Sequence, residues 1–166
     1  MSRNDPPPGR RAGVAAGSAL GLVLAALPLP HRDAAAKPPQ TCVVSVTPLQ
    51  FGNYNPSNPT GSMVTGNVVF NCAQSQPVTI FMDHGNGSAS GMRRMRGPGV
   101  VDFNIYFDAA ATRIWGDGAG GSTFYSNAAP PPGTNVVIPF YGLIPGRQRQ
   151  VTVGGYADSI IVRMNY

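Results

Sequence analysis

His84 is the first residue of this sequence whose side chain suggests chemistry, because it follows Asp83 directly at the start of a glycine-rich stretch. An imidazole beside a carboxylate can act as a general base when both face a substrate. The same pair is also typical of a solvated loop between two strands. The chain contains no Glu and no second carboxylate close to Asp83 in sequence. The sequence therefore favours a loop histidine over a catalytic one.

The other motifs that resemble catalytic or binding signatures each lack a required residue. Residues 87–91 have the outline of G-x-S-x-G, but Ala89 stands where the nucleophilic serine belongs. Residues 116–121 have neither the Lys of a phosphate-binding loop nor the alternating acids of a calcium loop. Residues 93–96, Arg-Arg-Met-Arg, indicate a solvated face, with a small anion-binding patch as the alternative. From these motifs we predict no enzymatic activity, no cofactor, no metal site and no small-molecule substrate.

Cys42 and Cys72 are the only cysteines of the chain. A metal site would need more ligands than these two thiolates and His84 can supply. In an oxidising compartment, two cysteines at the ends of strands are predicted to form a disulfide. Such a bond would close a loop of about 30 residues and stabilise the fold by about 3.5 kcal/mol on the chain-entropy account.

Residues 1–36 are predicted to be a signal peptide. Arg3, Arg10 and Arg11 precede a run of Ala, Gly, Val and Leu at 12–29, and residues 34–36 provide the small side chains of a cleavage site. A transmembrane anchor is the alternative. Proline and the many small residues in this run disfavour it, because a spanning helix needs about 20 strongly apolar residues. We therefore expect an exported domain that comprises residues 37–166.

The composition of residues 37–166 predicts an all-β domain. These residues contain one Lys and seven Arg against five Asp, a net charge of +3 compared with +5 for the whole chain. So small an excess, without a long basic run, does not indicate nucleic-acid binding. Helix-forming Glu is absent, whereas Val, Ile, Thr, Tyr and Phe alternate with Gly, Pro and Asn.

Short apolar stretches separated by turn residues predict seven to nine strands. This spacing is typical of a β-sandwich of the immunoglobulin type. The strands are expected at residues 41–47, 65–72, 78–83, 100–107, 135–141, 150–154 and 156–166.

The last stretch of the chain has the clearest strand pattern. From Ser159 the side chains alternate, and one face carries Ile160, Val162, Met164 and Tyr166. A terminal strand of this kind either pairs on both sides within its own sheet or leaves one edge bare. Arg163 is the only residue here of the kind that proteins use to blunt a bare edge. The pattern is therefore compatible with a strand that awaits a partner.

Aromatic residues near the predicted turns form a second candidate surface. Trp115, Phe124 and Tyr125 would form an adhesive loop if their rings are exposed. The sequence favours the alternative, in which Trp115 and Tyr141 pack under their own loops as part of the core.

Seven ordered segments of residues 41–166 together resemble spore coat protein U domains. No single segment is specific, but all occur in the expected order: residues 42–45, 51–56, 68–72, 93–95, 103–110, 115–118, and an ending formed by 141–148 with 154–162. The resemblance implies an exported subunit of the archaic chaperone–usher pilus class. In that class each pilin is an incomplete immunoglobulin-like sandwich that lacks its last strand. A periplasmic chaperone lends a strand, and a neighbouring pilin subunit later replaces it.

The resemblance also suggests a place for the groove and a role for the protein. The face formed by Ile160, Val162, Met164 and Tyr166 would border the groove that receives the donor strand. Residues 37–41, Lys-Pro-Pro-Gln-Thr, are too short and proline-rich to serve as a donor. We therefore expect a tip or minor subunit that passes an outer-membrane usher to the cell surface and contributes to adhesion or biofilm formation. The alternative is a free-standing secreted adhesive or coat protein with exposed aromatic loops.

Overall fold

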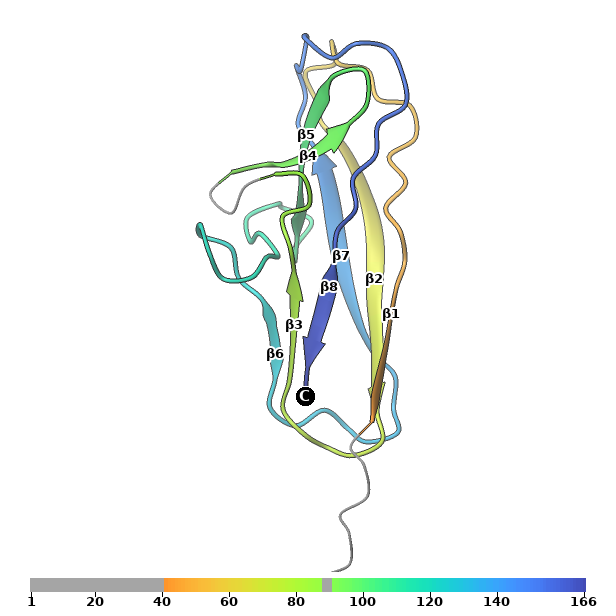
Figure 1. Cartoon of the computed structure of the whole chain (residues 1–166), viewed down its shortest axis with the longest axis vertical. Helices are drawn as coiled ribbons and strands as arrows, with labels where there is room; N and C mark the ends of the chain where they lie inside the picture. The colour runs from red at the N-terminus through yellow and green to blue at the C-terminus, as the bar shows by residue number, and fades with distance from the viewer. Residues whose placement is uncertain (1–40, 88–90) are drawn as a thin grey trace, which may run out of the picture. The chain divides into compact units, whose positions relative to one another are not determined.

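The computed structural model describes residues 41–87 and 91–166, which form β-strands and loops without a helix. The strands run in the order shown in Figure 1. Their bounds are β1 Cys42–Val46, β2 Ser62–Cys72, β3 Val78–Met82, β4 Arg93–Arg96, β5 Val100–Tyr106, β6 Tyr125–Asn127, β7 Val136–Ile144 and β8 Val162–Asn165. The predicted signal peptide lies outside the described residues. Within them, no helix has the length and apolarity that crossing a membrane requires.

The strands form two antiparallel sheets that pack face to face. The larger sheet has the order β1-β2-β7-β5-β4, and the smaller has the order β6-β3-β8. The sequence β1-β2-β7-β5 corresponds to strands A, B, E and D of an immunoglobulin sandwich, while β3 and β8 correspond to C and F. The fold is therefore all-β and immunoglobulin-like, as the sequence predicts.

Alternating side chains build the core between the sheets. In β2 the residues from Gly66 to Cys72 alternate between buried and half-buried positions, and β3 follows the same rule. This period of two arises because successive side chains of a strand point to opposite faces. The largest apolar side chains that the two sheets bury include Val68, Phe70, Ile80, Met82, Phe103, Trp115, Phe140 and Ile144.

The terminal strand is shorter than predicted. The sequence pattern predicts a strand over 156–166, but β8 covers only Val162–Asn165 and pairs with β3 from Met82↔Val162 to Thr79↔Asn165. Upstream, Ala157 exchanges two backbone hydrogen bonds with Arg96 of β4, at 2.8 and 3.0 Å. The chain therefore leaves the larger sheet at Ala157 and joins the smaller sheet only after Ile161.

Three further elements differ from the sequence prediction. Residues 150–154 form a loop, not a strand; Val153 is 96% exposed there and two glycines follow it. Strands β4 and β6 were not expected, because each has only three or four residues and polar or charged side chains dominate them. Both lie at the margin of a sheet, where short polar strands are tolerated.

Candidate functional site

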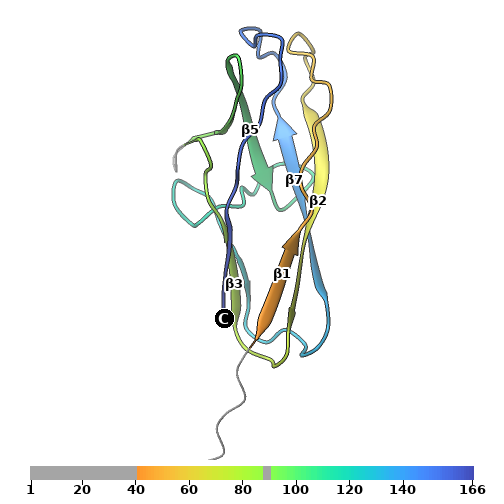
Figure 2. The same ribbon diagram turned by 45° about the vertical axis from the view of Figure 1, so that its right-hand side comes forward.

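A groove of about 1240 Å³ runs along one side of the sandwich. One margin is the segment 46–56, which follows β1, and the other is the segment 151–162, which leads into β8 (Figure 2). Its floor consists of core side chains from both sheets: Met82, Met95, Val101, Phe103, Ile105, Phe140 and Ile144. The groove thus gives access to the hydrophobic core between the two sheets.

The strands beside this groove each have one free edge. Within the described residues, β1 pairs only with β2 and β8 pairs only with β3. In a complete immunoglobulin sandwich, strand G pairs with strand F, which corresponds to β8 here. No strand from residues 41–87 or 91–166 occupies that place. The groove therefore combines exposed core side chains with unpaired backbone donors and acceptors, as a strand-binding site requires.

The lining of the groove is almost entirely uncharged. Among the described residues, Asp158 is the only charged one in the lining. Its carboxylate Oδ1 accepts hydrogen bonds from the backbone N–H and the side-chain amide of Asn86, at 3.1 and 2.7 Å. Because this carboxylate is held against the loop after β3, the surface left for a ligand is mainly apolar.

A glycine in β7 makes room for one wall of the groove. A Cβ at Gly142 would collide with the side chains of Leu49 and Phe51. Both are half-buried groove residues, and Phe51 also packs edge-on against Phe103 at 5.9 Å between ring centroids. The missing side chain at Gly142 therefore lets the segment after β1 lie close to the sheet.

The four residues predicted to form the groove face divide into two pairs. Ile160 and Val162 line the groove. Met164 packs against the core farther along β8, and Tyr166 is 53% exposed. The alternation predicted for this stretch is present, because Ile161 between the inward residues is also 53% exposed.

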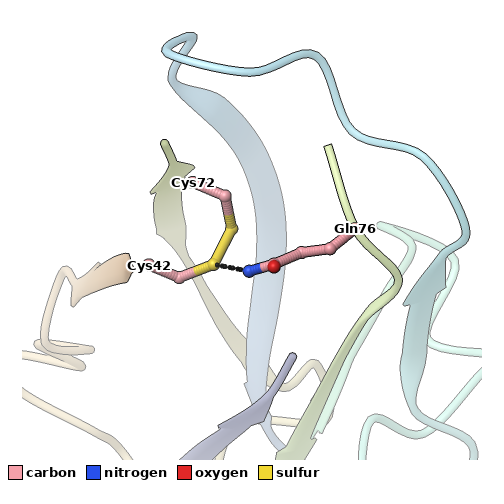
Figure 3. The surroundings of a disulfide bond; sticks show 3 residues. All are labelled: Cys42, Cys72 and Gln76. Carbon is pink, nitrogen blue, oxygen red and sulfur yellow. Dashed lines mark hydrogen bonds between the residues drawn. A yellow bond between two sulfur atoms is a disulfide. The ribbon is translucent and has the colours of Figure 1, made fainter. Parts of the chain in front are cut away.

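The disulfide between Cys42 and Cys72 is confirmed and ties β1 to β2 (Figure 3). The two Cα atoms are 4.1 Å apart and form a directly opposed pair in the β1–β2 register. The side-chain amide of Gln76 donates a hydrogen bond to the sulfur of Cys42 at 2.9 Å. The disulfide secures the start of β1, and the segment that follows β1 forms one margin of the groove.

Trp115 belongs to the core, which confirms the favoured alternative and removes this residue from the candidate adhesive loop. This ring is fully buried, stacks on Phe107 with 4.3 Å between centroids, and donates its N–H to the Ile80 carbonyl at 3.1 Å. Phe124 is 38% exposed and packs on Phe81, whereas Tyr125 is half-buried on β6. The three rings do not share one exposed surface, because the indole fills the core instead.

Arg93 is the largest departure from the sequence prediction, which placed residues 93–96 on a solvated face. Its side chain is completely buried. The guanidinium donates to the carbonyls of Asp83 and Trp115 and to Oδ1 of Asn104, at distances of 2.6–3.0 Å. Burial lowers the pKa of Arg93 to about 10, and the negative charge of Asp83 opposes this shift. The arginine therefore remains charged at neutral pH and joins β4 to β5, to the residue after β3 and to the loop that contains Trp115.

His84 is also less exposed than the sequence indicates. Its side chain is 13% exposed, and its Nδ1 lies 3.9 Å from a carboxylate oxygen of Asp117. Neither residue lines the groove. Among the described residues, no group of three or more His, Cys, Asp or Glu side chains could hold a metal ion. Thus His84 packs against the loop that contains Asp117 and contributes nothing to the groove lining.

Comparisons with known proteins agree with this architecture. The fold is similar to a chain in the crystal structure of the CsuC–CsuE chaperone–tip adhesion subunit pre-assembly complex from archaic chaperone–usher Csu pili of Acinetobacter baumannii. The TM-score is 0.57 at 17% sequence identity; the match covers 76% of this chain and 40% of that one. A search of curated protein sequences finds no significant match.

The family model described as the Spore Coat Protein U domain matches residues 32–163. The match begins shortly before the predicted cleavage site and continues into β8, so it includes both margins of the groove. The chain therefore belongs to the spore coat protein U domain family.

Proposed function

We propose that the protein is a structural subunit of a chaperone–usher pilus and that its groove receives a donor strand from another chain. The observation that carries this proposal is the free edge of β8 beside an apolar groove that reaches the core. The family membership and the similarity to a chain from a chaperone–subunit complex support it.

The groove is suited to an extended, apolar strand. An added strand would supply main-chain hydrogen bonds to the edge of β8 and insert alternate side chains between the sheets. Each large apolar side chain that becomes fully buried contributes roughly 1.5–3 kcal/mol. Four or five such side chains would outweigh the cost of ordering the incoming strand. The groove side chains Ile160 and Val162 would contact the strand directly, while Met164 and Tyr166 would flank its end.

The partners that follow from this role are a periplasmic chaperone, an outer-membrane usher and neighbouring pilin subunits. The chaperone would fill the groove after export through the predicted signal peptide, and a second subunit would fill it on the cell surface. Adhesion or biofilm formation is the biological role that such a pilus would serve. The protein would act by assembly alone, without catalysis.

We further propose a tip or minor position in the pilus. The support is the short, proline-containing segment 37–41 in front of Cys42, because proline removes backbone donors that a donor strand needs. Fusing an alternating apolar strand in front of Cys42 should make the protein polymerise. Long fibres formed by the unmodified protein alone would contradict this position.

Co-expression with a periplasmic chaperone of the same pilus class tests the proposed function. We expect a one-to-one complex that survives purification, and a marked loss of soluble protein when the chaperone is omitted. The variant Val162→Asp should fail to form the complex, because it places a charge in the groove. The variant Ile161→Asp is the matched control, since this neighbouring side chain points outward. Equal complex formation by both variants would contradict a role for the groove.

A further inference from the structure

A second cavity, of about 170 Å³, lies in the loop that joins β1 to β2. Its lining is polar and consists mainly of Asn53, Tyr54, Asn55, Asn58, Thr60 and Ser62. This loop and the loop between β7 and β8 lie at the end of the sandwich opposite the C-terminus (Figures 1 and 2). Pockets for drug-sized ligands measure about 300–1,000 Å³, so this cavity has room for a single small polar unit.

The asparagines of this cavity present hydrogen-bond donors. Oδ1 of Asn55 accepts a hydrogen bond from the Ser57 N–H at 3.0 Å. Oδ1 of Asn58 accepts from both the N–H and the hydroxyl of Thr60, at 3.2 and 2.9 Å. These turns use the oxygen of each amide, and no NH₂ group of the two forms a hydrogen bond within the described residues. Each amide therefore keeps two N–H donors for a ligand.

The backbone of Arg147 contacts a residue of the cavity lining, Asn58, and has a strained conformation. Its φ is 63°, in the left-handed region that residues other than glycine seldom adopt. The conformation is fixed because its N–H donates to the Asn58 carbonyl at 2.9 Å and Gly146 packs on Pro59. Its side chain is exposed. Backbone strain of this kind is retained mainly where it positions a functional group.

The surroundings of the cavity favour a negative ligand. The loops at this end, residues 53–61, 97–99 and 145–155, contain Arg147 and Arg149 but no acidic residue. The nearest carboxylate in the β4–β5 hairpin, Asp102, already accepts a hydrogen bond from Arg94 at 3.2 Å. A guanidinium with free donors binds carboxylates in a two-pronged geometry.

We propose that this end of the domain binds a carboxylate-bearing sugar unit of an acidic polysaccharide. The amides of Asn55 and Asn58 would donate to hydroxyl groups of the sugar, and Arg147 would bind its carboxylate. The combination explains why amide donors line one small cavity and why an arginine with a fixed backbone adjoins it. It also separates this site from a general anion-binding surface, which would need no cavity.

This inference goes beyond the proposed function and does not depend on it. The cavity shares only Asn53 and Tyr54 with the lining of the groove. The two amides and Arg147 that carry the inference lie outside the groove lining. Binding to the sugar should therefore be the same with the groove empty or filled.

Binding of trigalacturonate to the purified protein, measured by calorimetry with and without a donor-strand peptide, tests the proposal. We expect binding in both states. The methyl ester of the same trisaccharide, which lacks the negative charges, should bind at least tenfold more weakly. A short DNA duplex serves as a polyanion without sugar carboxylates.

Three variants, each of which lowers the net charge by one, separate the loss of a specific contact in the site from the general loss of positive charge. Asn58→Asp keeps the oxygen that accepts from Thr60 but replaces the NH₂ donor with a negatively charged oxygen. Arg147→Asn removes the guanidinium, and asparagine tolerates the positive φ of this position. Both should weaken trigalacturonate binding at least tenfold. Arg163→Gln, on the exposed face of β8, should leave it unchanged. Absent binding, equal binding of the methyl ester or DNA, or equal losses in all three variants would each overturn the proposal.

Discussion

Asp83 and Ile161 are joined by two hydrogen bonds at the point where the last segment of the chain enters the smaller sheet. The Asp83 N–H donates to the Ile161 carbonyl at 3.1 Å, and the Asp83 carboxylate accepts from the Ile161 N–H at 2.9 Å. The same carboxylate oxygen also accepts from the Gly85 N–H at 3.1 Å. Asp83 therefore holds the segment before β8 in place while that segment forms one margin of the groove.

Replacing Asp83 with Ala should loosen this margin. The variant removes the acceptor of two backbone N–H groups, so we expect a loss of about 1–3 kcal/mol in the free energy of unfolding. Asp83→Asn keeps an oxygen acceptor, so its free energy of unfolding should decrease less. Urea denaturation of both variants checks the order. An unchanged midpoint for Asp83→Ala would show that water satisfies these groups equally well.

Arg93 should be among the most sensitive positions in the chain. Arg93→Met leaves the carbonyls of Asp83 and Trp115 without a donor and removes one of the two donors to Oδ1 of Asn104. We expect the free energy of unfolding to fall by about 3–5 kcal/mol. Arg93→Lys keeps the charge but lacks the planar set of guanidinium donors, so we expect an intermediate decrease in the free energy of unfolding. Stability close to wild type for Arg93→Met in urea would contradict the importance of this network.

The pKa of Arg93 also predicts how its contribution depends on pH. Burial lowers that pKa from its ordinary value to about 10, so native and unfolded chains are both protonated at this residue well below pH 10. The difference in stability between wild type and Arg93→Met should therefore be constant from pH 6 to 8. Above pH 10 the unfolded chain retains more protons at Arg93, so the relative stability of the wild type should rise.

The sequence predicts a strand of this fold when the strand contains a long alternation of apolar and polar residues. The strands β2, β5 and β7 carry several alternating apolar residues, and the sequence locates each of them within a few residues. The short β4 and β6 lack such a pattern, because their pairing is decided by neighbours that are distant in sequence. The loop at 150–154 has a strand-like composition but no partner to pair with.

The candidate site was only partly predictable for a similar reason. The alternation from Ile160 identifies one margin of the groove, but nothing local indicates that segment 46–56 forms the other. Arg93 resembles an exposed charge, since its burial depends on acceptors from three separate segments. Trp115 lies beside a glycine-rich turn, yet its ring points into the core.

The disulfide should contribute strongly to stability. Thiol labelling of the denatured, unreduced protein should detect no free thiol, because Cys42 and Cys72 are bonded. Replacing both with Ser should lower the free energy of unfolding by about 3.5 kcal/mol, from the entropy of a loop of about 30 residues. Two reactive thiols in the native protein, or an unchanged unfolding midpoint in the double variant, would contradict this account.

The two aromatic residues Trp115 and Phe124 should respond differently to truncation. Trp115→Ala removes a fully buried ring and should lower the free energy of unfolding by about 3–5 kcal/mol. Phe124→Ala should lower it clearly less, because the Phe124 ring is 38% exposed. Thermal unfolding of both variants measures the difference. Loss of surface adhesion by Trp115→Ala without loss of stability would restore the adhesive-loop interpretation.

The thermal midpoint of the protein with and without a synthetic donor-strand peptide tests the central claim most directly. At a peptide concentration a thousandfold above the dissociation constant, the free energy of unfolding should rise by about 4 kcal/mol. For a domain of this size, the gain corresponds to a rise of roughly 10–20 °C. Val162→Asp should abolish the rise, while Ile161→Asp should retain it, because only Val162 lines the groove. A stable protein whose midpoint ignores donor peptides from every neighbouring subunit would contradict the claim that this groove receives a strand.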